Sequence, residues 1–262
     1  MDSKPTGHIV LWEGASLVQV KSHYTEFPRS QSGGGKRNKV SGFSRASRKR
    51  MMVLLNSLQE EALRKAKLIT LTYHRNEITT ENLKSNFKAF AQSIRRHRPN
   101  ASAVWKLEYQ QRGSPHYHLL FFGRRIQHTW LAERWNSIAE PGDHEHLQAG
   151  TRIESCYHAR NVGSYLTKYL GKVEEGGNVR TGIRHWGVIN KAALPIATRR
   201  VIPCGGALAR EVIQREYAKR SLGECGGSVG GVDLFFTNNG GARAFVDSIA
   251  GRAEVMEEWG QD

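Results

Sequence analysis

The stretch from residue 103 to residue 122 reads AVWKLEYQQRGSPHYHLLFF, and it decides the fold. Two segments, 103–110 and 116–123, have the length and composition of β-strands, and the residues between them carry the glycine and proline of a tight turn. This pattern predicts a β-hairpin with residues 111–115 as its loop. The rest of the fold is expected to assemble around this hairpin.

Two histidines, His116 and His118, stand two residues apart in the second strand of the hairpin. Side chains alternate across a strand, so both imidazoles are expected on the same face. A register that pairs even residues with even residues adds Glu108 to that face, and the predicted loop places Glu108 directly opposite His118. Two imidazoles and a carboxylate form a ligand set for Mn²⁺, Mg²⁺ or Zn²⁺. The alternative is that the histidines pack in the core and Glu108 is a surface carboxylate.

A second cluster of candidate ligands, residues 143–146, reads DHEH and follows a Pro-Gly pair. It has no apolar context and is predicted to be a polar loop. A supporting place beside the metal site is the alternative.

The segments around the hairpin alternate between strand and helix patterns. Further strands are predicted at 67–73, 151–157 and 184–190, and helices at 44–66, 80–98, 127–139 and 161–173. From residue 67 onward the order is β-α-β-β-α-β-α-β. This order predicts an α+β fold of the split βαβ type, with a central antiparallel sheet and helices packed mainly on one face.

The composition along the chain predicts three regions. Residues 1–40 form an N-terminal extension that ends in SQSGGGKRNK, a flexible basic linker, and residues 41–200 hold the predicted sheet. Residues 201–262 add a helix at 207–222 and a mobile tail. The tail contains VDLFFTN, which is predicted as a short strand or an apolar anchor.

The chain carries 39 Lys and Arg residues against 24 Asp and Glu residues, a net charge of +15 over 262 residues. This surplus favours a polyanionic partner, because phosphates bound by Lys and Arg release their counterions. The start of the helix at 44–66 and the turn of the hairpin are candidate contacts for DNA phosphates; their residues are Arg45, Arg48, Lys49, Arg50 and Arg112. A solvated cationic helix start is the alternative for the first four.

Two further features bear on the compartment. No apolar run approaches the ~20 residues that cross a bilayer, so no membrane contact is expected. The three cysteines form no CxxC pair, which suits a reducing cytosol. The expected location is the cytoplasm of a bacterial or phage-infected cell.

The predicted helix at 161–173 contains YLTKYLGK. At ~100° per residue, two phenols and two ammonium groups share one stripe beside the apolar stripe; the residues are Tyr165, Lys168, Tyr169 and Lys172. A phenol with its ordinary pKa of about 10 is a weak nucleophile at neutral pH, and an adjacent ammonium group stabilises the phenolate. The alternative is an amphipathic helix with tyrosines at its rim and solvated lysines.

Together these motifs resemble those of the HUH endonucleases, named for His-hydrophobic-His, in the two-tyrosine branch that initiates rolling-circle replication in plasmids and bacteriophages. KLITLTY resembles the first motif of that family, RGSPHYHLLFF its metal motif and YLTKYLGK its two-tyrosine motif, in the family's order. RHWGVINKAALP also resembles a segment of such proteins. The resemblance covers residues 40–200 and implies the ferredoxin-like fold of that family.

The resemblance also implies a function. Glu108, His116 and His118 would hold Mn²⁺ or Mg²⁺, and Tyr165 or Tyr169 would attack a phosphodiester of single-stranded DNA at a replication origin or hairpin. The attack would leave a 5′-phosphotyrosine link, which can be resealed without ATP, and a free 3′-OH for a polymerase. Lys168 and Lys172 would assist Tyr165 and Tyr169, respectively.

Host helicase and polymerase are the expected protein partners, because the chain has no Walker A pattern of a fused helicase. The sequence does not indicate an oligomeric state. Three other functions stay open at this point. The same chemistry serves transposition or conjugation in related enzymes, a basic module can bind single strands without cutting them, and two histidines with a glutamate can build a zinc hydrolase. The last function leaves the tyrosines unexplained.

Overall fold

The computed structural model describes residues 6–22, 42–110, 112–156, 182–205, 228–229, 232–236, 241–244 and 247. The chain divides into two compact units. The central unit comprises residues 36–52 and 62–195, and the terminal unit comprises residues 1–35, 53–61 and 196–262. The predicted hairpin and its histidines belong to the central unit.

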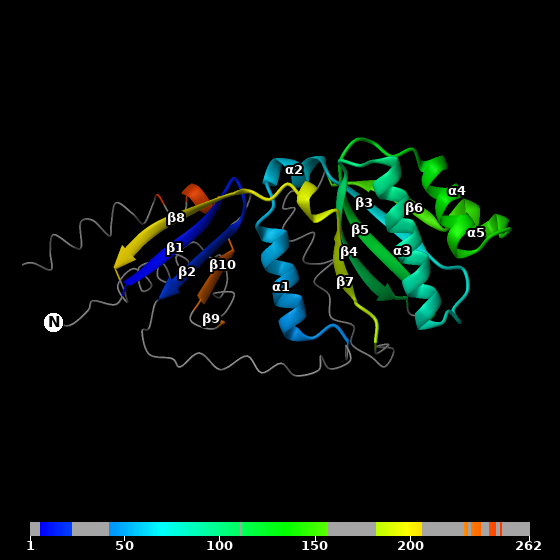
Figure 1. Cartoon of the computed structure of the whole chain (residues 1–262), viewed down its shortest axis with the longest axis horizontal. Coiled ribbons are helices and arrows are strands. Elements are labelled where there is room, and N and C mark those ends of the chain that lie inside the picture. The colour runs from blue at the N-terminus through cyan, green and yellow to red at the C-terminus, as the bar shows by residue number, and fades with distance from the viewer. Residues whose placement is uncertain are drawn as a thin grey trace, which may run out of the picture. The chain divides into compact units, whose positions relative to one another are not determined.

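A five-stranded antiparallel sheet forms the core of the central unit (Figure 1). Its strand order is β6-β3-β5-β4-β7, with the bounds β3 (Lys67–Thr72), β4 (Ser102–Tyr109), β5 (Pro115–Phe122), β6 (Thr151–Ser155) and β7 (Trp186–Ile189). Strands β3 and β4 both pair antiparallel with β5, so they run parallel to each other and are joined by helix α3 (Thr80–His97). This is the split βαβ order, which confirms the predicted α+β fold.

Helices α3 and α4 (His128–Ala139) pack against one face of the sheet (Figure 1). Helix α3 begins at a capping residue, Thr79, whose side chain accepts a hydrogen bond from the Asn82 N–H at 3.1 Å. The apolar stripe predicted for this helix is confirmed, because all four of its residues are buried: Leu83, Phe87, Phe90 and Ile94.

Alternation along the strands separates the core from the candidate site. Odd-numbered residues of β3, β4 and β5, such as Leu71, Trp105 and Tyr117, are buried with α3 and α4 in the core. Even-numbered residues point to the opposite face of the sheet. That face carries Thr70, Lys106, Glu108, His116 and His118.

The register of the hairpin differs from the predicted one. Glu108 is the Cα partner of His116, and Lys106 is the partner of His118. The predicted pairing of Glu108 with His118 is therefore wrong by two residues. Because the side-chain period of a strand is two, this shift keeps the carboxylate and both imidazoles on one face.

The loop of the hairpin explains the difference in register. It runs from Gln110 to Ser114, one residue earlier than predicted, and the Gln110 N–H donates to the Ser114 carbonyl at 2.9 Å. Gly113 adopts a φ of 85° within the turn, a left-handed conformation that favours glycine. Pro115 then begins β5, a position at which a strand tolerates the missing N–H.

The single helix predicted at 44–66 is instead two helices, α1 (Arg45–Asn56) and α2 (Glu60–Lys65). After α1, the Ser57 hydroxyl donates to the Leu54 carbonyl at 2.7 Å, a local bond that competes with continued helix. Leu58 is fully buried and forms an isolated β-bridge with Ile196. This extended pairing is incompatible with helix and separates α1 from α2.

A second five-stranded antiparallel sheet, in the order β8-β1-β2-β10-β9, forms the terminal unit. Its strands are β1 (Thr6–Glu13), β2 (Leu17–Ser22), β8 (Thr198–Gly205), β9 (Ser228–Val229) and β10 (Val232–Phe236). The sequence analysis does not predict this sheet, because residues 1–40 lack a clear strand pattern and their partners lie near the other end of the chain. The VDLFF segment is a strand, one of the two structures predicted for it.

Two short helices lie in the connections of the central sheet. Residues 143–146, predicted to be a polar loop, instead begin helix α5 (His144–Ala149), because the Asp143 side chain accepts a hydrogen bond from the His146 N–H at 2.9 Å and caps the helix. A short 3₁₀ helix, η2 (Lys191–Ala193), follows β7. The helices predicted at 161–173 and 207–222 lie outside the described residues. Within the described ranges, no helix has both the length and the apolar character needed to cross a membrane.

Candidate metal centre

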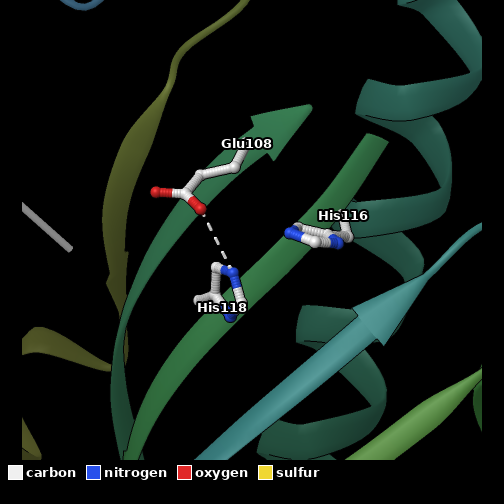
Figure 2. Close-up of side chains that lie close together, drawn as sticks. All are labelled: Glu108, His116 and His118. Atoms are coloured by element: carbon white, nitrogen blue, oxygen red, sulfur yellow. Dashed lines mark ion pairs between the residues drawn. The ribbon is translucent and has the colours of Figure 1, made fainter. Parts of the chain in front are cut away.

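Three side chains converge on the open face of the central sheet, as Figure 2 shows. Glu108 extends from β4, and His116 and His118 extend from the neighbouring strand β5. Oε2 of Glu108 lies 3.2 Å from Nε2 of His118, and the centroids of the two imidazole rings are 4.6 Å apart. One ligand atom of each residue lies within 4.8 Å of the ligand atoms of the other two.

This geometry fits a divalent cation. Neighbouring ligands of an octahedral ion with bonds of about 2.1 Å lie roughly 3 Å apart, close to the 3.2 Å between Glu108 and His118. His116 offers a second reason, since its Nδ1 is buried and has no hydrogen-bond partner among the described residues. A carboxylate with two imidazoles suits Mg²⁺, Mn²⁺ or Zn²⁺, and three ligands leave positions for substrate oxygens.

Thr70 holds one of the histidines in position. It lies on β3 as the Cα partner of His118, and its Oγ1 is 3.2 Å from Nδ1 of that imidazole. A hydrogen bond at Nδ1 fixes the ring and leaves Nε2 directed at Glu108. The sequence analysis does not identify Thr70, because the register between β3 and β5 depends on a pairing that no local motif encodes.

A buried cation, Lys106, adjoins the three candidate ligands. Its side chain is 1% exposed, and its Nζ forms an ion pair with Oε1 of Glu108. The same ammonium lies 5.3 Å from the centroid of the Phe43 ring, within range of a cation–π contact. The sequence analysis does not single out Lys106, although its even position in β4 places it on the face of Glu108.

These neighbours set the charges of the candidate ligands. Burial alone would raise the pKa of Glu108, but the hydrogen bond from His118 and the charge of Lys106 together hold that pKa at about 2. Burial lowers the pKa of His116 to about 4, and the nearby His118 contributes in the same direction. An ionised carboxylate and a neutral imidazole are the forms that bind a metal ion at neutral pH.

The predicted DNA-binding residues of α1 lie beside this face of the sheet. The Trp186 indole N–H on β7 donates to Oγ of Ser47 in the first turn of α1 at 2.8 Å, and Trp186 is the Cα partner of Lys106. The start of α1 therefore lies on the side of the sheet that carries the histidines. Four cationic side chains occupy these turns, partly or fully exposed: Arg45, Arg48, Lys49 and Arg50.

Arg112, the fifth predicted DNA contact, is exposed in the loop between β4 and β5. Its guanidinium donates to the Tyr73 carbonyl at 3.3 Å, and its charge helps to lower the pKa of His116. Arg112 also lines a cavity of about 190 Å³ at the end of β3. The other residues lining this cavity are Thr72, Tyr73, His74, Glu145, His146, Ala149 and Gly150.

The tyrosine between the two histidines is excluded as a nucleophile. Tyr117 points into the core, where its hydroxyl donates to the Leu83 carbonyl at 3.2 Å and burial raises its pKa. The predicted nucleophiles, Tyr165 and Tyr169, and their lysines, Lys168 and Lys172, lie outside the described residues.

Comparison with known proteins adds one finding. Residues 66–174 match the model of a family of replication-associated proteins, the ORF2 type. No curated protein and no solved structure matches the chain. The matched segment contains the three converging side chains and both tyrosines of YLTKYLGK. Over this segment the chain is similar to replication-associated proteins, which indicates a role in DNA replication.

Proposed function

We propose that the protein initiates rolling-circle replication by nicking and rejoining single-stranded DNA through a tyrosine nucleophile and a divalent metal ion. The observation that carries this proposal is the convergence of Glu108, His116 and His118 on one face of the sheet. These residues lie in the segment that is similar to replication-associated proteins. The convergence supports a metal-assisted reaction, and the similarity supports DNA as its substrate.

The reaction is an exchange of one phosphoester for another. The phenol oxygen of Tyr165 or Tyr169 attacks the scissile phosphorus and loses its proton, and the bond from phosphorus to the 3′ oxygen breaks. The departing oxygen takes up a proton and becomes a free 3′-OH, while the 5′ phosphate stays on tyrosine. Because one phosphoester replaces another, the 3′-OH of a strand can reverse the reaction without ATP.

The side chains of the sheet serve this reaction by binding and orientation. Bound Mn²⁺ or Mg²⁺ would polarise the scissile phosphate and withdraw charge from its oxygens. Thr70 orients the His118 ring through Nδ1, and Lys106 holds one oxygen of Glu108 so that the other faces the histidines. The site is therefore preorganised before a substrate arrives.

The tyrosines and lysines of YLTKYLGK supply the nucleophiles in this proposal. Lys168 assists Tyr165 and Lys172 assists Tyr169, since an ammonium group stabilises a phenolate and neutralises phosphate charge. Two nucleophiles would let one tyrosine cut a new origin while the other still holds the parent strand. The released 3′-OH primes a host polymerase, with a host helicase opening the duplex.

Single-stranded DNA would reach the metal centre between two cationic elements. The exposed basic turns of α1 border the face of the sheet that carries the histidines, and Arg112 lies at the hairpin loop. Arginine and lysine in these places can contact phosphates on either side of the scissile bond. These contacts position the strand without reading its sequence.

A labelled-DNA experiment tests the proposal. The full-length chain is incubated with Mn²⁺ and a pool of single-stranded oligonucleotides that have a randomised centre and a 3′ label, and the products are separated on denaturing gels. The proposal predicts labelled DNA covalently attached to protein. The adduct should disappear in Tyr165→Phe/Tyr169→Phe and in His118→Ala, and should persist in His144→Ala, a matched change at an exposed histidine outside the metal centre.

The other outcomes identify the competing functions. Binding without cleavage would show a non-catalytic module for single-stranded nucleic acid, and cleavage without an adduct would show a hydrolase that uses activated water. Either result contradicts the proposal. Persistence of the adduct in His118→Ala would remove the metal centre from the reaction.

A further inference from the structure

A cluster of arginines lies at the end of the central sheet that is remote from the metal centre. Three come from the connection between α3 and β4, and two from the connection between β5 and α4; they are Arg95, Arg96, Arg98, Arg124 and Arg125. The two connections are neighbours, because Ser102 at the start of β4 is the Cα partner of Phe122 at the end of β5. We call these five residues the arginine cluster.

The cluster is held together although its charges repel. Nη2 of Arg98 donates to the Arg125 carbonyl at 3.4 Å, which ties one connection to the other. Within the described part of the chain, no carboxylate forms an ion pair with any of the five arginines. Four of them are exposed. Five uncompensated guanidinium groups on adjacent loops favour a polyanionic partner.

Helix electrostatics explain only part of the cluster. Arg95 and Arg96 lie in the last turn of α3, where cations interact favourably with the helix dipole. Arg124 and Arg125 follow a strand and precede α4, so no helix C-terminus accounts for them. Guanidinium groups, with their planar fork of donors, are suited to phosphate oxygens.

A cavity of about 550 Å³ adjoins the cluster and indicates the form of the partner. Its floor is apolar, with Ile69, Phe121 and Ile126 all buried, and its rim carries the cations Lys67 and Arg125. The one carboxylate that lines it, Glu154, is paired with Arg152 at 2.9 Å. An apolar floor beneath a cationic rim suits an unstacked base and its phosphate, which a single strand can offer and a duplex cannot.

The cavity and the metal centre lie on different faces of the sheet. Ile69 and Phe121 are odd-numbered residues on the side of α3 and α4, whereas His116 and His118 point to the other side. Along β5, His116 and Phe122 are six residues apart, which corresponds to roughly 20 Å. A strand in the metal centre cannot fill the cavity with the same nucleotide.

We propose that the arginine cluster and its cavity form a second, non-catalytic binding surface for single-stranded DNA. This inference rests on the proposed function for the identity of the polyanion. The surface would hold a single strand on the helix side of the sheet while another part of the DNA occupies the metal centre. Its contacts are phosphates on the arginines and one unstacked base in the cavity.

Paired variants test the surface. Arg124→Ala/Arg125→Ala removes two charges of the cluster, and Lys84→Ala/Lys88→Ala is the matched control, because it removes two exposed charges from α3 away from the cluster. Binding of a fluorescent 30-nucleotide single strand is measured by anisotropy over a series of KCl concentrations. Circular dichroism verifies that each variant is folded.

The arginine variant is expected to bind the strand at least fivefold more weakly than the control. The slope of log K against log salt should fall by about 1.4, since each lost phosphate contact on a single strand contributes about 0.7. In Ser155→Trp, an indole placed in the cavity should weaken binding and leave the salt slope unchanged. Equal losses in the arginine and control variants would overturn the proposal, and so would an equal loss on a duplex of the same length.

Failure of this inference can be distinguished from failure of the proposed function. If the proposed function is wrong, the unmodified chain forms no covalent adduct with any oligonucleotide. If the second surface is wrong, the adduct forms but the arginine and control variants bind the long single strand equally.

Discussion

The ammonium group of Lys106 pairs with Oε1 of Glu108, and the other oxygen of that carboxylate lies 3.2 Å from Nε2 of His118. Each oxygen therefore has its own partner. Because the Lys106 side chain is 1% exposed, water screens its charge little. A divalent cation beside Glu108 is attracted by the carboxylate and repelled by the ammonium group.

Lys106→Met tests this balance. The change keeps an apolar stem of similar length and removes the repelling charge, so Mn²⁺ should bind roughly tenfold more tightly, a difference of about 1.4 kcal/mol. Nicking should slow, because Glu108 is then free to turn and to bind the ion through both oxygens. Isothermal titration calorimetry with Mn²⁺ measures the affinity, with Lys84→Met as the exposed control. Weaker Mn²⁺ binding in Lys106→Met would show that the lysine supports the ligands without opposing the ion.

Thr70→Val tests the orientation of His118. Valine has nearly the shape of threonine but cannot hydrogen-bond to Nδ1 of the imidazole, which lies 3.2 Å from the Thr70 hydroxyl. Loss of such a supporting bond lowers metal affinity by about 10- to 100-fold. Thr129→Val, on an exposed position of α4, is the control. Equal Mn²⁺ affinities in the two variants would remove Thr70 from the metal centre.

The face shared by the metal ligands could be predicted from sequence, but their pairing could not. The two-residue spacing of His116 and His118 and the even position of Glu108 determine which side of the sheet they occupy. Whether Glu108 pairs with His116 or His118 depends on where the loop closes, and the Gln110–Ser114 hydrogen bond decides this. A shift of two residues leaves the face unchanged, so the ligand set was found despite the wrong register.

Two neighbours of the ligands and one whole sheet were not found from sequence. Lys106 could have been placed on the ligand face by its parity, but its burial depends on the start of α1, where Phe43 lies near its ammonium group. Thr70 depends on the pairing of β3 with β5. The sheet of the terminal unit depends on pairing of β1 with β8, whose residues lie far apart in the sequence. Long-range pairing leaves no periodic signal in a short window.

The pKa of His116 gives a prediction for the metal-free protein. Burial disfavours the imidazolium form, so the ring should titrate at about 4 and not at the ordinary 6.5. The unfolded chain binds this proton near pH 6.5 and the folded chain near pH 4, so acidification through that window favours unfolding. NMR titration of the imidazole carbon and nitrogen resonances measures the midpoint. A midpoint at or above 6.5 would contradict a buried, neutral ring at this position.

The basic start of α1 gives a prediction for DNA binding. Arg48→Ala/Lys49→Ala/Arg50→Ala should weaken binding of single-stranded DNA and lower the salt slope by about 2, since three phosphate contacts are lost at about 0.7 each. The affinity for Mn²⁺ should stay unchanged, because none of the three is a metal ligand. Anisotropy over a KCl series gives the slope. A slope equal to that of the unmodified chain would remove α1 from the DNA interface.

The identity of the nucleophile is the central claim, and peptide mapping of the covalent adduct tests it most directly. Trypsin cleaves after Arg160, Lys168 and Lys172, so Tyr165 and Tyr169 fall in separate peptides, 161–168 and 169–172. After nuclease digestion of the adduct formed in Mn²⁺, mass spectrometry should find a nucleotide remnant on one or both of these peptides. A remnant on any other residue, or complete cleavage of the DNA with both peptides unmodified, would contradict the account.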